Sequence, residues 1–477
     1  MFTFIGYLAL LIGGYIVYGA VVERIFGIDR SRPTPAIAMN DGVDYVPMPW
    51  WRVFLIQFLN IAGLGPIFGA IMGMMYGPAA FLWIVLGTIF AGGVHDYFSG
   101  MMSVRERGAS LPELIGNELG KYIKLFMRLF SVLLMVLVGA VFISGPAGLL
   151  AGLTPGISAL IWTAIIFAYY VLATLLPIDK LIGKIYPIFG AALLFMAVGI
   201  LFALFWNKAP IPELTAGFAN SNPNKSLHIF PMMFVSIACG AISGFHATQS
   251  PMMARCIKNE KYGRRCFYGA MVAEGVVALI WAAAASSFFG SVEGLHKFVA
   301  DLPATANKGA EVVNLISNRW LGVVGGVLAI LGVVAAPITS GDTALRSARL
   351  IVADFLHLNQ KSIAKRLMIS IPIFVLTFVI LNMDFDVLWR YFAWCNQTLA
   401  VFTLWAITAY LCRLRKFYFI TLVPAIFMTY VSSTYLFAAA RPEGIGLPYE
   451  TALIVGAGIT TAVFSVFVVS LKKLQKN

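Results

Sequence analysis

A histidine and an aspartate stand next to each other in a stretch that is otherwise apolar. His95 and Asp96 lie in the segment AGGVHDYFSG, within residues 81–102. An ionised side chain in hydrocarbon costs at least about 2.5 kcal/mol, so it must be paired, hydrated or used. Histidine titrates near neutral pH, and a neighbouring carboxylate shifts that titration. We therefore expect this pair to exchange protons with a ligand pathway, with a structural bond from Asp96 to a basic or amide group as the alternative.

The spacing of these acidic residues predicts how they pair. Neighbouring residues on a helix project about 100° apart. We therefore expect His95 and Asp96 to face different partners rather than form a simple ion pair. Asp342 precedes Arg346 by four positions, a spacing that allows an ion pair on one helix face. Asp342 is thus either a structural partner of Arg346 or part of an ion pathway.

Other polar groups in apolar segments could contact a ligand. His246 follows Ser243 and Gly244 in the segment SGFHATQSP. A lone histidine in a membrane often only packs and hydrogen-bonds, but beside such small residues we expect it to line the pathway. Asn396 and Gln397 are adjacent amides in another apolar segment, where amides also serve to join helices. We include both among the candidate ligand contacts.

Composition places these residues in a membrane protein. The chain has 477 residues, of which 60% are hydrophobic and 12% charged, with a mean hydropathy of +0.86. No soluble domain of this length hides so much apolar surface from water. Runs of roughly twenty apolar residues recur, each long enough to cross about 30 Å of hydrocarbon as a helix. We predict an all-α polytopic membrane protein with about thirteen spans, at residues 2–22, 53–77, 79–103, 129–152, 157–176, 186–206, 229–250, 266–290, 320–340, 367–382, 387–411, 417–437 and 449–471.

The distribution of basic residues predicts the orientation. With thirteen spans, most of the 34 Lys and Arg residues fall on one side, which the positive-inside rule assigns to the cytoplasm. The N-terminus is then outside and the C-terminus inside. Topology and anionic lipid explain the net charge of +13, so we expect membrane lipid as a partner and no nucleic acid. The opposite side receives only Lys208, Lys225, Lys297, Lys308, Arg319, Arg390 and Arg441.

Cysteines and acidic loop residues add little chemistry to this scheme. The five cysteines are odd in number and lack a metal-like spacing, so neither a disulfide framework nor a zinc site is expected. We expect no cofactor. Asp41 and Asp44 precede the second span and could form an inner gate with a basic loop.

Two glycine-interrupted spans suggest an internal repeat. NIAGLGPIFGAIMG (60–73) and SIACGAISGFHATQSP (236–251) lie five spans apart and run in opposite directions. Paired interruptions of this kind are typical of inverted-repeat transporters, in which unwound backbone meets the substrate at mid-membrane. The alternative is that the glycines only permit close helix packing. The interruptions add Asn60, Gly63, Gly65, Pro66, Gly240, Ser243 and Gly244 to the candidate ligand contacts.

The repeat divides a single membrane transport domain, residues 1–477, into parts. The halves are 53–206 and 229–411, with one extra helix (1–22) before them and two (417–471) after. The half-helix amides would bind a carboxylate, and a side chain at Gly65 would intrude on the bound group. A small monocarboxylate or a short peptide, held mainly by backbone, fits this arrangement.

The absence of certain motifs in the sequence narrows the function. There is no G-x-x-x-x-G-K-[ST] loop, so an ion gradient would supply the energy for transport. Neither HExxH nor GxSxG is present, so an enzyme is not expected. Secondary active import by alternating access is the leading hypothesis. An uncoupled channel, a nutrient sensor and an intramembrane enzyme are the alternatives.

The five-plus-five arrangement resembles the amino acid–polyamine–organocation superfamily, which includes the bacterial leucine transporters. In that fold, adjacent hydroxyls on the eighth core helix complete a sodium site, a role the resemblance gives to Thr339 and Ser340. Several segments are also similar to the carbon starvation protein A family, namely DGVDYVP (41–47), IAGLGPIFG (61–69), GGVHDYFSG (92–100), SVRERGASL (103–111), SGFHATQSP (243–251), TSGDTALRSARLIVAD (339–354) and WRYFAWCNQTLA (389–400).

The family resemblance has functional implications. It implies uptake of peptides or pyruvate across a bacterial inner membrane, the latter with protons. The chain is shorter than the longer members, and HATQSPMMARC replaces a loop that is rich in Ser, Gly and Thr in them. We prefer protons to sodium as the coupling ion, because of the histidines and the family.

Overall fold

The chain is helical throughout its described part. The computed structural model describes residues 1–42, 45–175, 186–213, 215, 217–303, 306–356, 358 and 362–474. Within these ranges no strand occurs, and the only β-type pairing is an isolated bridge between Met48 and Ile257. The fold is therefore the all-α polytopic membrane architecture predicted from the composition.

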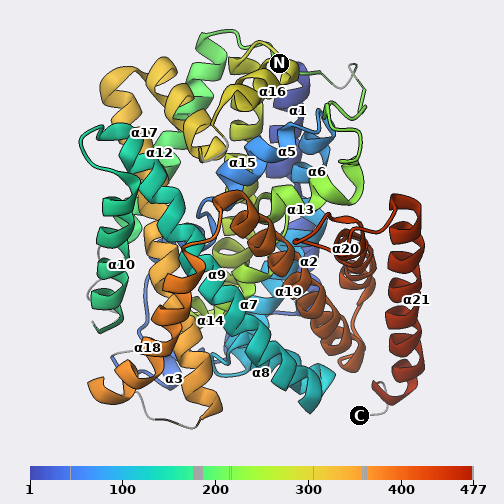
Figure 1. Cartoon of the computed structure of the whole chain (residues 1–477). Coiled ribbons are helices and arrows are strands. Elements are labelled where there is room, and N and C mark those ends of the chain that lie inside the picture. Colours follow the sequence, from blue (N-terminus) through green and yellow to red (C-terminus); the bar gives the residue numbers. More distant parts are fainter. Residues whose placement is uncertain are drawn as a thin grey trace.

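Helices occur along the whole described chain (Figure 1). The first half contains α1 Phe2–Gly13, α2 Gly19–Phe26, α3 Pro35–Ala38, α4 Trp50–Ile61, α5 Ala70–Met74, α6 Ala79–Gly87, α7 Gly93–Arg105, α8 Leu111–Leu119, α9 Lys121–Leu153, α10 Ala159–Leu175 and α12 Tyr186–Trp206. The second half contains α13 Phe234–Ile237, α14 Gly244–Ala254, α15 Gly269–Phe288, α16 Val292–Asp301, α17 Lys308–Phe355, α18 Ile363–Ile380, α19 Phe385–Arg413, α20 Phe419–Ala438 and α21 Tyr449–Leu474.

Eleven helices of the described chain are long and apolar enough to cross a membrane. A bent pair, Trp50–Ile61 with Gly65–Met74, meets the same test jointly, and Ala159–Ala173 is a shorter apolar helix. Each of the thirteen predicted spans overlaps one of these elements. The number of spans that cross the bilayer, the inverted repeat and the division into halves stay predictions.

Burial separates central helices from peripheral ones. The most apolar windows of Ala79–Arg105, Glu260–Phe288 and Phe385–Arg413 are each 83% buried, whereas those of Phe2–Phe26 and Tyr449–Leu471 are 22% buried. Figure 1 shows α21 standing at the edge of the bundle, where it packs on α20. The first and last helices thus lie at the periphery of the bundle.

Both predicted helix interruptions are confirmed. At the first interruption, α4 ends at Ile61 and the helix resumes at Gly65 with a bend of 56°. The second break begins at Ala238, which has a φ of 39°, and α14 starts at Gly244. Pro66 removes a backbone donor just after the first break, whereas at the second break the non-helical torsions fall on Ala238, Ala241 and Ser243. We call residues 62–64 the first break and residues 238–243 the second break.

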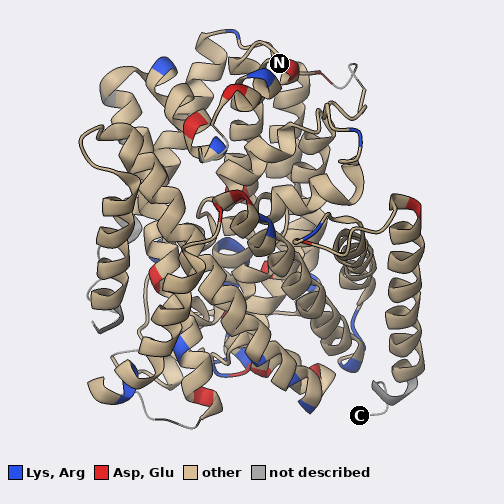
Figure 2. Ribbon diagram, in the orientation of Figure 1, with Lys and Arg blue, Asp and Glu red and all other residues tan. Residues whose placement is uncertain are grey.

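Charged residues mark the two ends of the bundle. Figure 1 shows the N-terminus and the C-terminus at opposite ends, and Figure 2 shows many charged residues gathered at those ends. We call the end at which α1 begins the outer end and the opposite end the inner end, following the predicted orientation. α16 lies at the outer end, and α3 and α8 lie at the inner end (Figure 1).

Candidate functional site

A carboxylate shared by two histidines lies in the interior, just inward of the second break. Asp96 on α7 contacts His246 on α14, with 2.9 Å between Oδ2 and the imidazole Nδ1. Its other oxygen, Oδ1, lies 2.7 Å from Nδ1 of His95. All three side chains are fully buried. The arrangement can hold or pass a proton, because each imidazole nitrogen facing Asp96 either donates to the carboxylate or accepts from its protonated form.

Glu274 on α15 extends this network. Its Oε2 lies 3.3 Å from Nε2 of His246, and the side chain is fully buried. His246 therefore stands between two acidic groups, one at each ring nitrogen. We call His95, Asp96, His246 and Glu274 the buried network.

The expectation that His95 and Asp96 face apart is wrong. Their Cβ atoms diverge on α7, but Nδ1 lies close to the backbone of a histidine and the short carboxylate rotates toward it. The result is the 2.7 Å contact. Helix geometry set the directions of the Cβ atoms, and side-chain torsions then brought the polar ends together.

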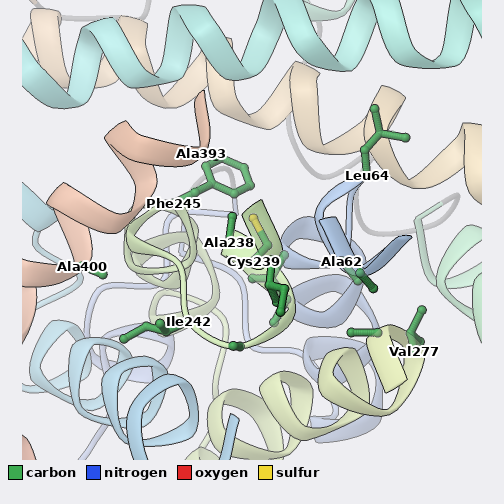
Figure 3. Close-up of a cluster of buried hydrophobic side chains, with 14 of the residues drawn as sticks. Ala62, Leu64, Ala238, Cys239, Ile242, Phe245, Val277, Ala393 and Ala400 are labelled. Carbon is green, nitrogen blue, oxygen red and sulfur yellow. The ribbon is translucent and has the colours of Figure 1, made fainter. Parts of the chain in front are cut away.

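The space between the two breaks is filled by small and apolar side chains. Figure 3 shows Ala62 from the first break near Ala238 and Cys239 from the second. A Cβ on Gly65 would lie 2.3 Å from Cβ of Cys239, so the two breaks are in direct contact. The space predicted to hold a bound group beside Gly65 is occupied by Cys239.

Aromatic rings connect this central region to the outer end. Neighbouring ring centroids lie 5.3–6.2 Å apart along the series. The last ring is that of Phe245, which directly precedes His246, so the series ends beside the buried network. We call this series the aromatic column, which consists of Phe385, Phe68, Trp389, Phe392, Phe142 and Phe245.

The aromatic column begins at the floor of a cavity of about 600 Å³. Phe68, Ser236 and Ala393 line this cavity, which places it against both broken segments and α19. Its wall includes His296 of α16, whose Nε2 donates to the carbonyl oxygen of Met75. We call it the outer cavity, and its volume is in the range of sites that enclose organic ligands.

The inner end is closed by the chain between α2 and α4. In this segment, which we call the strap (residues 27–42 and 45–49), the amide N of Met48 donates to the carbonyl oxygen of Cys256. Oγ1 of Thr34 donates to the carbonyl oxygen of Ile257, and the amide of Asp29 donates to Glu260. The strap thus covers the loop that follows α14.

An ion pair reinforces this closure. Arg105 at the end of α7 donates two hydrogen bonds to Glu260, at 3.0 and 3.2 Å, and Glu260 is fully buried. Asp41, one of the two predicted gate residues, accepts a hydrogen bond from the amide of Tyr45. Asp44, the other, lies outside the described residues. The described chain thus has a cavity toward the outer end and hydrogen-bonded segments at the inner end.

Apart from His246, the predicted ligand contacts fall into three groups. Asn60 and Asn396 are fully buried, and their side-chain amides have no hydrogen-bond partner among the described residues. Gln397 instead donates to the carbonyl oxygen of Ile242 and joins α19 to the second break. The others lie at the two breaks or against them, namely Gly63, Gly65, Pro66, Gly240, Ser243 and Gly244.

The predicted ion-site residues on α17 bond to backbone carbonyl oxygens or, in the case of Asp342, to a nearby arginine. Thr339 donates to the carbonyl oxygens of Ala335 and Ala336, and Ser340 donates to that of Leu59, just before the first break. Nη2 of Arg346 lies 3.6 Å from Oδ2 of Asp342, so the ion pair that the spacing allowed is present. Among the described residues no group of three or more His, Cys, Asp or Glu could hold a metal ion.

Sequence reasoning missed Glu274 and the charges of the outer cavity. Glu274 is the only acidic residue in the predicted span 266–290, so its position in an apolar run was a usable signal. The cavity charges Lys308, Asp386, Arg390 and Glu443 sit at helix ends and in a loop, where charges are ordinary. Only the fold brings them to one wall.

Known proteins resemble this chain in fold. Its structure matches the crystal structure of the Eremococcus coleocola manganese transporter with a TM-score of 0.61 and 12% identity, over 92% of this chain and 99% of that one. At this identity the likeness shows the fold alone.

Relatives in sequence include named transporters. The chain is 43% identical over 350 residues to an uncharacterized membrane protein of Haemophilus influenzae, a match that covers 63% of this chain and 94% of that protein. It is 30% identical over 338 residues to the peptide transporter CstA and 29% over 329 residues to the pyruvate/proton symporter BtsT, both of Escherichia coli. These matches cover 56% of this chain and 47% and 46% of the two transporters, so the chain spans about half of their length.

A family model completes the comparison. The model of carbon starvation protein CstA matches residues 1–160 and 154–322, which together make up more than half of the chain. The segments that suggested the resemblance from 41–47 to 243–251 lie inside the matched residues. The chain belongs to the carbon starvation protein CstA family.

Proposed function

We propose that this protein is a secondary active importer of the bacterial inner membrane. It couples the entry of protons to the uptake of a small carboxylate such as pyruvate, or of a short peptide, by alternating access. The N-terminus lies outside and the C-terminus in the cytoplasm. Relatives named as a peptide transporter and as a pyruvate/proton symporter support this proposal.

The observation that carries the proposal is the position of the buried network beside the second break. Asp96 bonds to His246, which is the third residue of α14 after the break. A change of charge on this pair alters the attraction between α7 and α14. Because α14 begins at the break, that attraction acts on a backbone that can bend.

Electrostatics explains why a proton would accompany the substrate. Moving an unpaired charge into a low-dielectric interior is costly, and an anionic substrate brings one negative charge inward. A proton bound at the Asp96–His246 pair balances that charge. Release of the proton toward the inner end restores the starting state, and Glu274 at the far nitrogen of His246 offers the next acceptor.

The architecture supplies a route for alternating access. The substrate enters the outer cavity, and the aromatic column together with the apolar side chains between the breaks separates it from the buried network. Separation of the strap from the loop after α14 would open the inner end. Asn60 and Asn396, buried without hydrogen-bond partners among the described residues, are the amides we assign to substrate when the breaks separate.

Proton movement in vesicles tests the proposal. Full-length protein is reconstituted into proteoliposomes that contain a pH-sensitive dye, and pyruvate or L-alanyl-L-alanine is added outside without sodium. We expect acidification of the lumen that depends on the ligand and is absent with the Asp96→Asn variant. Uptake that requires sodium and ignores the pH gradient would overturn proton coupling, and equilibration without accumulation would indicate a channel.

A further inference from the structure

The outer cavity carries charges of both signs, arranged in two ion pairs. Nζ of Lys308 lies 2.7 Å from a carboxylate oxygen of Asp386, and Nη2 of Arg390 lies 2.6 Å from one of Glu443. All four residues line the cavity, and they are the only Lys, Arg, Asp and Glu residues among its described lining. The cavity wall is therefore neutral overall but polar at two places.

A neutral wall that carries two ion pairs attracts anions and zwitterions to different degrees. A simple anion gains attraction from each cation and meets repulsion from the neighbouring carboxylate, so its net attraction is small. A zwitterion, with a free amine at one end and a carboxylate at the other, finds an opposite charge for each end. The charge pattern therefore suits a zwitterion better than a monocarboxylate.

The spacing of the charges agrees with a short chain. Asp386 and Arg390 lie four residues apart on α19 and are about 6 Å apart along its axis. An extended chain of two residues spans about 7 Å. The amine and the carboxylate of a dipeptide can thus reach one residue each.

Helix electrostatics supports the same role for Lys308. It is the first residue of α17, where the positive end of the helix dipole disfavours a cation. Asp386, in the first turn of α19, stands where an anion is favoured. In the Lys308–Asp386 pair, the helix dipole therefore stabilises Asp386 and disfavours Lys308. A substrate amine can replace Lys308 readily for this reason.

The floor of the cavity suits the rest of such a ligand. Phe68, Phe385 and Trp389 form a cluster of aromatic rings with centroids 6.0–6.2 Å apart. Nε1 of Trp389 and Nε of Arg390 are buried and have no hydrogen-bond partner among the described residues. Both residues line the cavity, so each donor can serve a carboxylate there once Arg390 turns from Glu443.

From these observations we infer that the outer cavity is a recognition site for zwitterionic substrates of dipeptide size. The amine binds Asp386 in place of Lys308, and the carboxylate binds Arg390 in place of Glu443. This inference rests on the proposed transport function, since it names the substrate class of that transporter. It adds four specificity-determining residues that lie apart from the buried network.

Exchange of the ion-pair partners for substrate would also link binding in the outer cavity to the second break. Lys308 belongs to α17 and Glu443 to the connection between α20 and α21, so the two ion pairs fasten the start of α19 to both. Binding of the substrate releases both fastenings. Farther along α19, Gln397 bonds to the carbonyl oxygen of Ile242 in the second break.

Binding measurements on full-length, detergent-solubilised protein test the inference without any gradient. The probes are L-alanyl-L-alanine, its N-acetyl derivative, its C-terminal amide and pyruvate, each titrated by calorimetry or by tryptophan fluorescence. We expect the free dipeptide to bind at least tenfold more tightly than each of the other three. Equal binding of the blocked and free dipeptides, equal or tighter binding of pyruvate, or no binding of the dipeptide would overturn it.

Variants assign the two ends of the ligand. Asp386→Asn should weaken binding of the free dipeptide at least tenfold and leave binding of the N-acetyl form unchanged. Arg390→Gln should likewise weaken binding of the free dipeptide at least tenfold and leave binding of the C-terminal amide unchanged. Glu118→Gln, which removes an ion pair with Arg413 at the inner end, is the matched control and should bind the dipeptide as the wild type does. Loss of binding to all probes alike in both variants would overturn the assignment.

The outcome is independent of proton coupling. Tight dipeptide binding without ligand-driven acidification would overturn the proposed coupling and leave the recognition site in place. Proton-coupled uptake of pyruvate without dipeptide binding would overturn the recognition site and leave the coupling in place.

Discussion

Asp96 and His246 contact each other at 2.9 Å although 150 positions separate them in the chain. The contact joins α7 to the start of α14, directly after the second break. A polar bond at a break can hold one arrangement of two helices and release it when its charge changes. This relationship makes the protonation of one pair a means of changing the backbone around the substrate path.

His246 should matter more than His95 for transport. His246 lies between Asp96 and Glu274, whereas among the acidic groups of the described chain His95 contacts only Asp96. We expect His246→Gln to lower the initial rate of uptake at least tenfold and to abolish ligand-driven acidification, with a smaller loss for His95→Gln. The measurement is radiolabelled uptake into proteoliposomes, normalised to folded protein.

A third histidine provides the control for this comparison. His228 stacks on Tyr449 with a centroid distance of 3.7 Å, away from the buried network. His228→Gln should transport at the wild-type rate. Uptake by the His246→Gln variant at the rate of the His228→Gln variant would return His246 to a packing role.

Glu274 should be needed for coupling rather than for ligand passage. It faces only the far side of His246 in the buried network, so its loss removes a proton acceptor without reshaping the outer cavity. For Glu274→Gln we expect loss of uptake driven by a pH gradient, with exchange of internal for external ligand retained. Glu23→Gln, which removes a contact with Arg264, is the control. Equal loss of both activities would contradict this separation.

Close contact between the breaks should make Gly65 intolerant of a side chain. In Gly65→Ala the new Cβ would lie 2.3 Å from Cβ of Cys239, and overpacking of this kind costs about 1–3 kcal/mol. We expect a lower unfolding temperature in detergent, with recovery in the double variant Gly65→Ala/Cys239→Gly. Gly458→Ala is the control, because nothing lies within 4 Å of the new Cβ there. If both single variants unfold at the same temperature, the breaks are not packed as described.

Breaking the Arg105–Glu260 pair should loosen the strap. Glu260 accepts hydrogen bonds from Arg105 and from the amide of Asp29, so Glu260→Gln weakens two attachments at once. The reporter is Cys256, which is 6% exposed beneath the strap, in a variant whose other four cysteines are alanine. We expect labelling of Cys256 by a soluble maleimide to accelerate at least tenfold.

The control for this labelling is Glu118→Gln, which removes another ion pair at the inner end without touching the strap. Its labelling rate should match that of the cysteine-reduced parent. An unchanged rate in Glu260→Gln would show that the pair does not hold the strap closed.

The predicted orientation can be tested with fusions. We expect a fluorescent protein at the C-terminus to fluoresce in the cytoplasm, and alkaline phosphatase fused after Asn220 to be active outside. The reason is the excess of Lys and Arg on the segments assigned to the cytoplasm. The opposite pattern of activity would reverse the outer and inner ends used throughout.

The sequence by itself determined the features that depend on local composition. Runs of about twenty apolar residues predicted where helices lie, because hydrocarbon requires every backbone polar group to be bonded within the segment. Pro66 and the glycines at 63–65 and 240–244 predicted both breaks, because their backbone preferences hold in any surroundings. The pairing of Asp342 with Arg346 was likewise a matter of one helix turn.

Only the tertiary structure decided which polar groups meet. Nothing in the order of residues places Glu274 at the far nitrogen of His246, or brings Lys308 to Asp386. Such contacts depend on how helices pack, and packing sums many weak contacts over the whole chain. The prediction that His95 and Asp96 would face different partners failed for a related reason. Periodicity describes Cβ directions, whereas the surrounding protein selects the side-chain torsions that place polar atoms.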